Sequence, residues 1–236
     1  MGKLIAHRGW SGIAPENTIS AIRLALEEEK IDAIELDVHL SSDGVPVVIH
    51  DYTLERTTNG IGNVKDYTVQ QLKELDAGSW FNKNFKGEKI PTLEEVLQLV
   101  GIKKKLFIEL KQMGSVYEGL EKKVTELLMK YNMADEATII SFDPYSLLRS
   151  KNAAENIQRT LVLFNMPLLL QEQLHVIGAQ SISINSRCID QHIVDNLIAA
   201  DIQLIVWTVD DQEEAKRLLR ITDEIMITTN HPERLW

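Results

Sequence analysis

Cysteine and long apolar runs are nearly absent from this sequence of 236 residues. Cys188 is the single cysteine, so the chain cannot form an internal disulfide, and a reducing, cytoplasmic setting is expected. No nucleophile motif surrounds Cys188, so we expect a small packed residue there. No apolar run approaches the roughly 20 residues of a membrane-spanning helix, so we expect no stable membrane insertion. Lys3 and Arg8 leave no room for the apolar part of a secretory signal.

Basic residues are outnumbered by acidic ones. Lysine and arginine total 25 against 35 aspartates and glutamates, which gives a net charge of −10. A broad nucleic-acid surface needs a basic patch, so nucleic acid is not an expected partner. A small anionic substrate is compatible with this charge if a metal ion or a few placed cations create a local positive site. The composition leaves the oligomeric state open, and a homo-oligomer is compatible with it.

Short apolar runs alternate with helical patterns along the chain. Alternation of this kind, with continuous apolar strands, predicts a parallel sheet covered by helices. Eight such units in 236 residues predict an α/β fold, a single (β/α)8 TIM barrel over residues 1–236. The expected strands are 3–6, 33–38, 106–110, 137–142, 160–164, 181–184, 204–209 and 225–228. The expected helices are 15–29, 92–100, 117–131, 145–152, 167–177, 191–200 and 212–219.

One stretch interrupts this rhythm. A further β run at 45–49 follows the turn Ser42-Asp43-Gly44, and residues 51–90 are rich in turn-forming residues. We expect residues 51–90 to form a small inserted subdomain after the second barrel strand, a cap at the mouth of the barrel. Its aromatic residues are expected to be its buried core, and contact with an acyl chain of a substrate is the alternative; these residues are Trp80, Phe81 and Phe85.

Acidic residues stand at the ends of two neighbouring barrel strands, where enzymes of this fold place their catalytic groups. Glu35 and Asp37 are two residues apart on one strand, so their side chains face the same side. Glu109 adds a third inward carboxylate on the next barrel strand. Three carboxylates suit a hard divalent cation, Ca²⁺ or Mg²⁺, better than they suit zinc. The alternative is a set of structural salt bridges with basic residues of neighbouring strands.

Two histidines and two basic residues follow the same pattern. His7 and His50 end strand-like runs, and histidine is suited to acid–base catalysis near neutral pH. A structural role is the alternative for each of them. Arg8 and Lys111 are the cations that a phosphoryl group would need, unless they form salt bridges to the acidic cluster.

The remaining candidates near the strand ends are weaker. Trp207 is expected either to stack on a substrate or to plug the top of the barrel. His39 shares the parity of the acidic residues, but it lies beyond the apolar run, so we expect it to be a solvated loop residue. No catalytic role is expected for the other histidines, which are His175, His192 and His231.

The motifs now assembled resemble those of the glycerophosphodiester phosphodiesterase family. The match covers essentially the whole chain and is densest over residues 5–111. In the first half it comprises His7-Arg8-Gly9, Ala14-Pro15-Glu16-Asn17-Thr18, residues 33–38, Asp43-Gly44, residues 47–51, Leu54 and residues 56–62. It continues with residues 75–81, residues 90–96, Ile108-Glu109-Leu110-Lys111, Ser141-Phe142-Asp143 and Trp207-Thr208-Val209.

The resemblance implies metal-dependent hydrolysis of glycerophosphodiesters to an alcohol and sn-glycerol 3-phosphate, on a (β/α)8 barrel with a small insertion. By motif position it assigns metal ligation to Glu35, Asp37 and Glu109. It assigns acid–base roles to His7 and His50, without saying which is the acid and which the base, or whether a cyclic phosphate forms. It assigns phosphate contacts to Arg8 and Lys111.

Two positions depart from the family pattern. Asn230 stands where the family usually has aspartate, and Asp210 stands where it commonly has asparagine. Because both are expected at the barrel mouth, the departures put the contacts with the substrate end in doubt. Two rival functions remain: cleavage of a lysophospholipid in the manner of a phospholipase D, and a non-catalytic barrel that only binds phosphodiesters or a partner.

Overall fold

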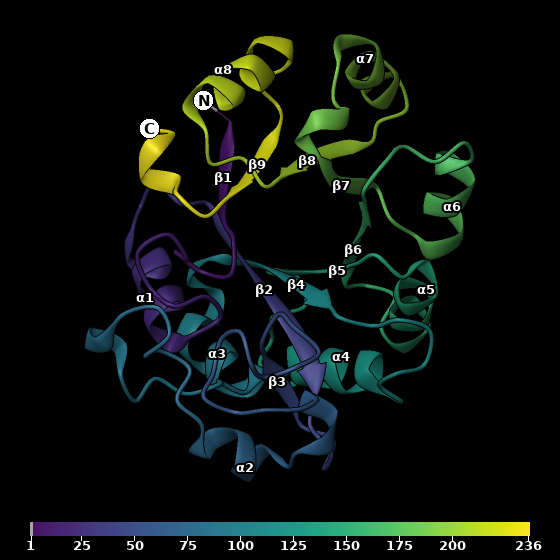
Figure 1. Ribbon diagram of the computed structural model, residues 1–236. Coiled ribbons are helices and arrows are strands. Elements are labelled where there is room, and N and C mark those ends of the chain that lie inside the picture. The colour runs from purple at the N-terminus through teal and green to yellow at the C-terminus, as the bar shows by residue number, and fades with distance from the viewer. Residues whose placement is uncertain (1) are drawn as a thin grey trace.

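The computed structural model describes residues 2–236, and within them eight parallel strands close into a barrel (Figure 1). Closure is made by β1, which pairs with both β2 and β9. The (β/α)8 fold predicted from the sequence is therefore confirmed. In order around the ring the strands are β1 (Lys3–Ala6), β2 (Ala33–Leu40), β4 (Lys105–Leu110), β5 (Ala137–Ser141), β6 (Gln158–Leu163), β7 (Ser181–Asn185), β8 (Gln203–Trp207) and β9 (Met226–Thr229).

Helices surround the ring of strands. They are α1 (Ile19–Glu27), α3 (Leu93–Val100), α4 (Leu120–Lys130), α5 (Pro144–Ala153), α6 (Leu170–Ile177), α7 (Gln191–Ala199) and α8 (Gln212–Ile221), while α2 (Val69–Glu74) lies outside this ring (Figure 1). α3 begins with a capping box, since Thr92 and Glu95 cap each other's backbone. α1 begins later than the predicted residue 15, because Thr18 caps it by accepting from the Ala21 backbone N–H. Residues 7–17 therefore form the loop that joins β1 to α1.

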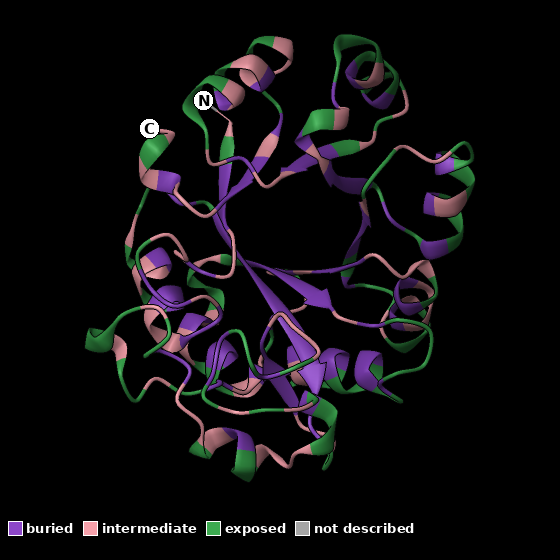
Figure 2. Ribbon diagram, in the orientation of Figure 1, coloured by how far each residue is buried: buried purple, intermediate pink, exposed green. Residues whose placement is uncertain are grey.

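Apolar side chains fill two layers. Those of β2 that point outward, such as Ile34, Leu36 and Val38, pack against the surrounding helices and are fully buried. A smaller inward-facing group fills the barrel itself: Ile5, Ala33, Phe107, Ile140, Val162 and Ile205. Figure 2 shows the strands buried and the outward faces of the helices exposed. Because this inner group fills the barrel, the polar residues further along the strands lie above a closed floor.

The β run after the second barrel strand is β3 (Pro46–Val48), which pairs antiparallel with the end of β2. Residues 51–90 follow it and contain α2 and two 3-10 turns, Val64–Asp66 and Lys83–Phe85. Their core is aliphatic, made by Val47, Ile49, Leu54, Val64, Leu72, Ala77 and Ile90. The expectation of an aromatic core is wrong: Trp80 is 40% exposed, and it packs edge-to-face with Phe81 outside that core.

The aromatic residues lie outside because their loop is organised by polar contacts. The Asp76 carboxylate accepts hydrogen bonds from the backbone N–H groups of Gly78, Ser79 and Gly87. The Trp80 indole N–H donates to the Ala77 carbonyl and so ties the ring to the same loop. In the part of the chain that the structure describes, no helix combines the length and apolar character needed to cross a bilayer.

Candidate active site

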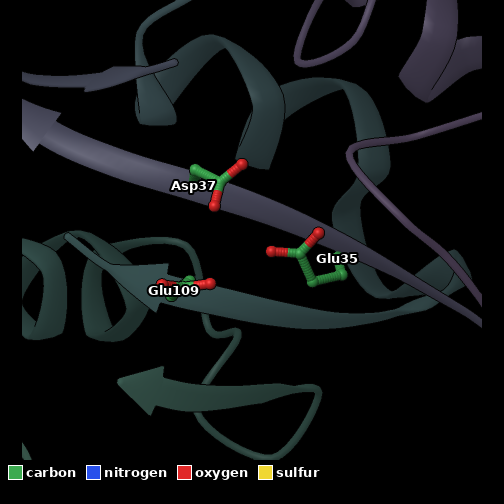
Figure 3. Close-up of side chains that lie close together, drawn as sticks. All are labelled: Glu35, Asp37 and Glu109. Atoms are coloured by element: carbon green, nitrogen blue, oxygen red, sulfur yellow. The ribbon is translucent and has the colours of Figure 1, made fainter. Parts of the chain in front are cut away.

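Three buried carboxylates meet where β2 and β4 pair. Glu35 and Asp37 come from β2, and Glu109 comes from β4, where it is in register with Asp37 (Figure 3). One carboxylate oxygen of each lies within 4.8 Å of the others. Their exposed fractions are only 3%, 1% and 8%. The alternation of side chains along a strand brings Glu35 and Asp37 to the same side, as the sequence indicated.

Two basic side chains compensate part of this negative charge. Lys111 Nζ lies 2.7 Å from Glu109 Oε1 and 2.9 Å from Asp37 Oδ1. Arg8 Nε lies 3.3 Å from Asp37 Oδ2. The salt bridges that the sequence left as an alternative are therefore formed, but they centre on Asp37 and Glu109. Three carboxylates face two cations, so one negative charge is left without a partner.

The Glu35 carboxylate is the one that has no basic side chain paired with it among residues 2–236. Its Oε2 accepts from the Arg8 backbone N–H at 3.0 Å, while its buried Oε1 has no hydrogen-bond partner among residues 2–236. Burial raises the pKa of Glu35 well above its ordinary value, and repulsion by Asp37 and Glu109 raises it further. Burial acts on Asp37 in the same direction, but Lys111 and Arg8 outweigh it and hold the pKa of Asp37 well below its usual range.

These features fit a hard divalent cation. A bound cation would give the orphaned Glu35 oxygen a partner and would offset the repulsion among the three carboxylates. Oxygen donors alone are what Mg²⁺ and Ca²⁺ prefer. The salt bridges to Lys111 and Arg8 hold the pKa of Asp37 low, but burial still raises the pKa of Glu109 despite Lys111, and no lysine or arginine side chain of residues 2–236 forms a salt bridge with Glu35.

His7 lies beside the carboxylates at the end of β1. Its Nδ1 is 2.7 Å from Asn230 Oδ1, and its Nε2 is 3.9 Å from Glu35 Oε2. Burial lowers the pKa of His7 to about 4, with a further contribution from Arg8, so the ring is neutral near pH 7. A neutral imidazole at this position is able to accept a proton.

His50 follows β3 and has a different partner. Its Nδ1 is 2.6 Å from Asp51 Oδ1, and Arg56 in turn holds both oxygens of Asp51. Arg56 also donates to Glu16, which pairs with Arg8. Burial lowers the pKa of His50. Its contact with a carboxylate, where His7 contacts an amide, distinguishes the two histidines.

A cavity of about 260 Å³ opens between these groups. One side is polar and is lined by His7, Arg8, Glu35, His50, Glu109 and Lys111. The opposite side is aromatic: Phe142, Phe164 and Trp207 lie with ring centroids 4.7 to 5.6 Å apart. The Trp207 indole nitrogen is buried and has no partner within the described chain. A larger cleft, of about 390 Å³, lies at the other end of the barrel beside Lys3, Gln203 and Met226. None of the residues that line the first cavity line this cleft.

The expectation that His39 is a solvated loop residue is wrong. β2 extends through it, and its ring is fully buried. Its Nε2 is 2.9 Å from the His50 carbonyl oxygen, and its Nδ1 is 2.7 Å from the Tyr117 hydroxyl oxygen. The apolar run ends at Val38, but pairing with β3 prolongs the strand and buries the residue. His39 therefore fixes the backbone that carries His50.

Sequence reasoning gave no role to three further residues of the site. The Asn17 amide donates to Asp37 Oδ2 at 2.7 Å and accepts from the Asp37 backbone N–H, so it orients that carboxylate. Asp51 and Arg56 support His50. Asn17, Asp51 and Arg56 all stand in the motifs of the first half, which is the signal that could have identified them.

The chain matches the family model described as "Glycerophosphoryl diester phosphodiesterase family" over residues 7–234. It is 41% identical over 236 residues to a glycerophosphodiester phosphodiesterase of Caldanaerobacter subterraneus, with 98% of this chain and 95% of that protein covered. It is 35% identical to a glycerophosphodiester phosphodiesterase of Bacillus altitudinis, with 99% and 96% covered.

A solved structure of an Oleispira antarctica phosphodiesterase in complex with the product sn-glycerol-3-phosphate is similar throughout. Its TM-score is 0.92 and its sequence identity is 32%, with 100% of this chain and 95% of that chain covered. A glycerophosphodiester phosphodiesterase structure from Agrobacterium tumefaciens has a TM-score of 0.85 and 31% identity, with 100% and 99% covered.

Proposed function

Because the chain belongs to the glycerophosphoryl diester phosphodiesterase family and is a phosphodiesterase, we propose that it hydrolyses glycerophosphodiesters to an alcohol and sn-glycerol 3-phosphate. The observation that carries the proposal is the cluster of three buried carboxylates, which shares one cavity with two cations and two histidines. A barrel that only binds phosphodiesters would have no need of an unpaired buried carboxylate beside two histidines.

Glu35, Asp37 and Glu109 would hold the divalent cation. When bound, it supplies Lewis-acid stabilisation of the negative charge on the phosphoryl oxygens. We propose Mg²⁺ or Ca²⁺ because the donor set contains only carboxylate oxygens. The orphaned Oε1 of Glu35 supports this assignment.

Arg8, Lys111 and Trp207 would hold the substrate. Arg8 and Lys111 carry the positive charge of the cavity wall, and phosphate oxygens accept hydrogen bonds from both types of side chain. The Trp207 N–H is a buried donor without an acceptor in the described part of the chain, so a substrate oxygen would satisfy it.

His7 and His50 would move the protons. One accepts the proton of the attacking water, or of a glycerol hydroxyl whose cyclic phosphate water then opens, and the other donates a proton to the oxygen of the leaving alcohol. Each has its Nδ1 held by another side chain, which fixes the orientation of its ring. Arg56 and Asp51 orient His50 from residues 51–90, and we propose that this segment is a cap that completes the site.

A lysophospholipid is the second candidate substrate, because one side of the cavity is aromatic and Phe164 is 64% exposed at its edge. A cytoplasmic location remains a prediction from the single cysteine.

The test is a coupled assay for glycerol 3-phosphate release from several glycerophosphodiesters, with choline release from lysophosphatidylcholine measured in parallel. We expect turnover to disappear in excess chelator and to return with Mg²⁺ or Ca²⁺. Glu109→Gln should lose turnover at any metal concentration. The control Glu213→Gln removes the same charge from a side chain that is 73% exposed on α8 and should be as active as wild type. Full turnover of metal-stripped protein would contradict the proposal.

A further inference from the structure

His7 is held by a chain of two residues that the proposed roles leave unused. Asp210 follows β8 and Asn230 follows β9, and they are the two positions that depart from the family pattern. The departures were expected to affect the substrate end. Instead, Asp210 contacts Asn230, and Asn230 contacts His7.

Asp210 fixes which way the Asn230 amide points. Its Oδ1 accepts from the Thr229 hydroxyl at 3.0 Å and from the Asn230 backbone N–H at 2.8 Å. Its Oδ2 lies 2.7 Å from the Asn230 side-chain amide nitrogen. An ionised carboxylate accepts hydrogen bonds and cannot donate them, so the amide must turn its NH₂ group toward Asp210. Its carbonyl oxygen must then point the other way.

That carbonyl oxygen in turn fixes the proton of His7. Asn230 Oδ1 accepts from the Ser11 hydroxyl at 2.8 Å and lies 2.7 Å from His7 Nδ1. A carbonyl oxygen only accepts, so His7 must carry its hydrogen on Nδ1. The neutral ring then has its free lone pair on Nε2, the nitrogen that faces the carboxylate cluster at 3.9 Å from Glu35.

We propose that Asp210 and Asn230 are positioning residues that lock His7 in the Nδ1–H tautomer, so that Nε2 is the atom that accepts the proton. The inference rests on the proposed function for its kinetic consequences, but the tautomer itself can be measured without turnover. The Nδ1 of His50 also faces an acceptor, which is the Asp51 carboxylate.

Exchanging the side chains of Asp210 and Asn230 tests whether they determine the tautomer of His7. In Asp210→Asn, the new amide would face the NH₂ group of Asn230 with its own NH₂ group. Asn230 relieves this clash by turning over, which presents NH₂ to His7 Nδ1 and favours the Nε2–H tautomer. In Asn230→Asp, two carboxylates would meet where the nitrogen–oxygen distance is now 2.7 Å, and they would repel. The double exchange puts a donor opposite an acceptor again and restores Nδ1–H.

The measurements are kcat, KM and the His7 tautomer. Long-range ¹⁵N–¹H NMR reports the tautomer on histidine-labelled, Mg²⁺-loaded protein, with His7→Gln as the assignment control. Asp210→Asn should lower kcat by about 10²-fold or more, the usual worth of a general base, with little change in KM. The double exchange should recover most of the kcat that Asp210→Asn loses. Asp211→Asn is the matched control, because it removes the neighbouring charge and still caps α8.

The outcomes separate the two proposals. If Asp210→Asn keeps the Nδ1–H tautomer and wild-type kcat, the lock is wrong. If Asp210→Asn does not fold, Asn230→Asp and the double exchange still test the proposal. Loss of kcat in Asn230→Asp that the double exchange does not restore would overturn it. If wild type and Asp211→Asn both fail to release glycerol 3-phosphate, the proposed function is wrong, and the NMR spectra still decide the tautomer.

Discussion

Replacing Glu35 by glutamine should make the metal-free protein more stable while abolishing its response to metal. Glu35 is buried beside two other carboxylates, and one of its oxygens has no partner within residues 2–236. Its pKa is raised well above the ordinary value, first by burial and then by Asp37 and Glu109. An acid with a raised pKa in the folded state loses stability as pH rises from its unfolded pKa toward the raised value. Glutamine never ionises, and it can still accept from the Arg8 backbone N–H.

The magnitude follows from the spacing of the charges. Ligand oxygens within 4.8 Å of one another repel by about 3 kcal/mol per pair or more at an effective dielectric constant of about 20. Arg8 and Lys111 offset part of this repulsion, but the raised pKa shows that the balance is unfavourable. We expect Glu35→Gln to gain roughly 1–3 kcal/mol of unfolding free energy at pH 8 without metal. Wild type should instead gain about 2.7 kcal/mol when metal is present at 100 times its Kd.

The assay is urea unfolding of both proteins in chelator and in excess Mg²⁺, at pH 8 and at pH 5. The gain from Glu35→Gln should shrink at pH 5, where the wild-type carboxyl is more often protonated. Glu121→Gln is the matched control: this buried glutamate accepts from Gln112, Ser146 and Arg149, so losing its charge should destabilise the fold. A Glu35→Gln protein that is less stable than wild type in chelator, or that keeps the full metal response, would refute the reasoning.

Three further predictions concern individual side chains of the site. His7→Ala and His50→Ala should each lower kcat by about 10²–10⁴-fold with the fold intact, and the double variant should be far less than additive; near-normal kcat in either would exclude the pair. Burial lowers the pKa of His39 from 6.5 to about 4, so wild-type stability should fall as pH drops through this window, by roughly 3 kcal/mol in all from this ring. His39→Gln should lose that part of the pH dependence in urea unfolding at pH 7.5 and 4.5, and an unchanged dependence would contradict the assignment. Trp207→Phe keeps a ring but removes the buried N–H, so KM should rise more than kcat falls, and unaltered kinetics would exclude the substrate contact.

The barrel strands were predictable because each is a short apolar run in a chain of ordinary composition. The site residues on those strands were predictable for a related reason. Alternation along β2 determines that Glu35 and Asp37 share a face, and the parallel register determines that Glu109 lies beside them.

Residues whose position depends on long-range pairing were not predictable in the same way. His39 is buried because β3 folds back on β2, which no local pattern around His39 specifies. Asn17 and Asn230 reach the site from loops, and their partners are 20 and 223 residues away in the sequence. The prediction that Trp80 is buried was wrong because it rested on hydrophobicity alone. The hydrogen bonds around Asp76 keep its loop at the surface.

The most direct test of the central claim is which phosphorus–oxygen bond breaks. Metal-loaded protein would be incubated with glycerophosphocholine, and the products identified by ³¹P NMR and mass spectrometry, with Glu109→Gln and chelated wild type as controls. Our account predicts choline and sn-glycerol 3-phosphate from the loaded wild type alone. Phosphocholine and glycerol as products, or equal release from the chelated protein, would contradict it.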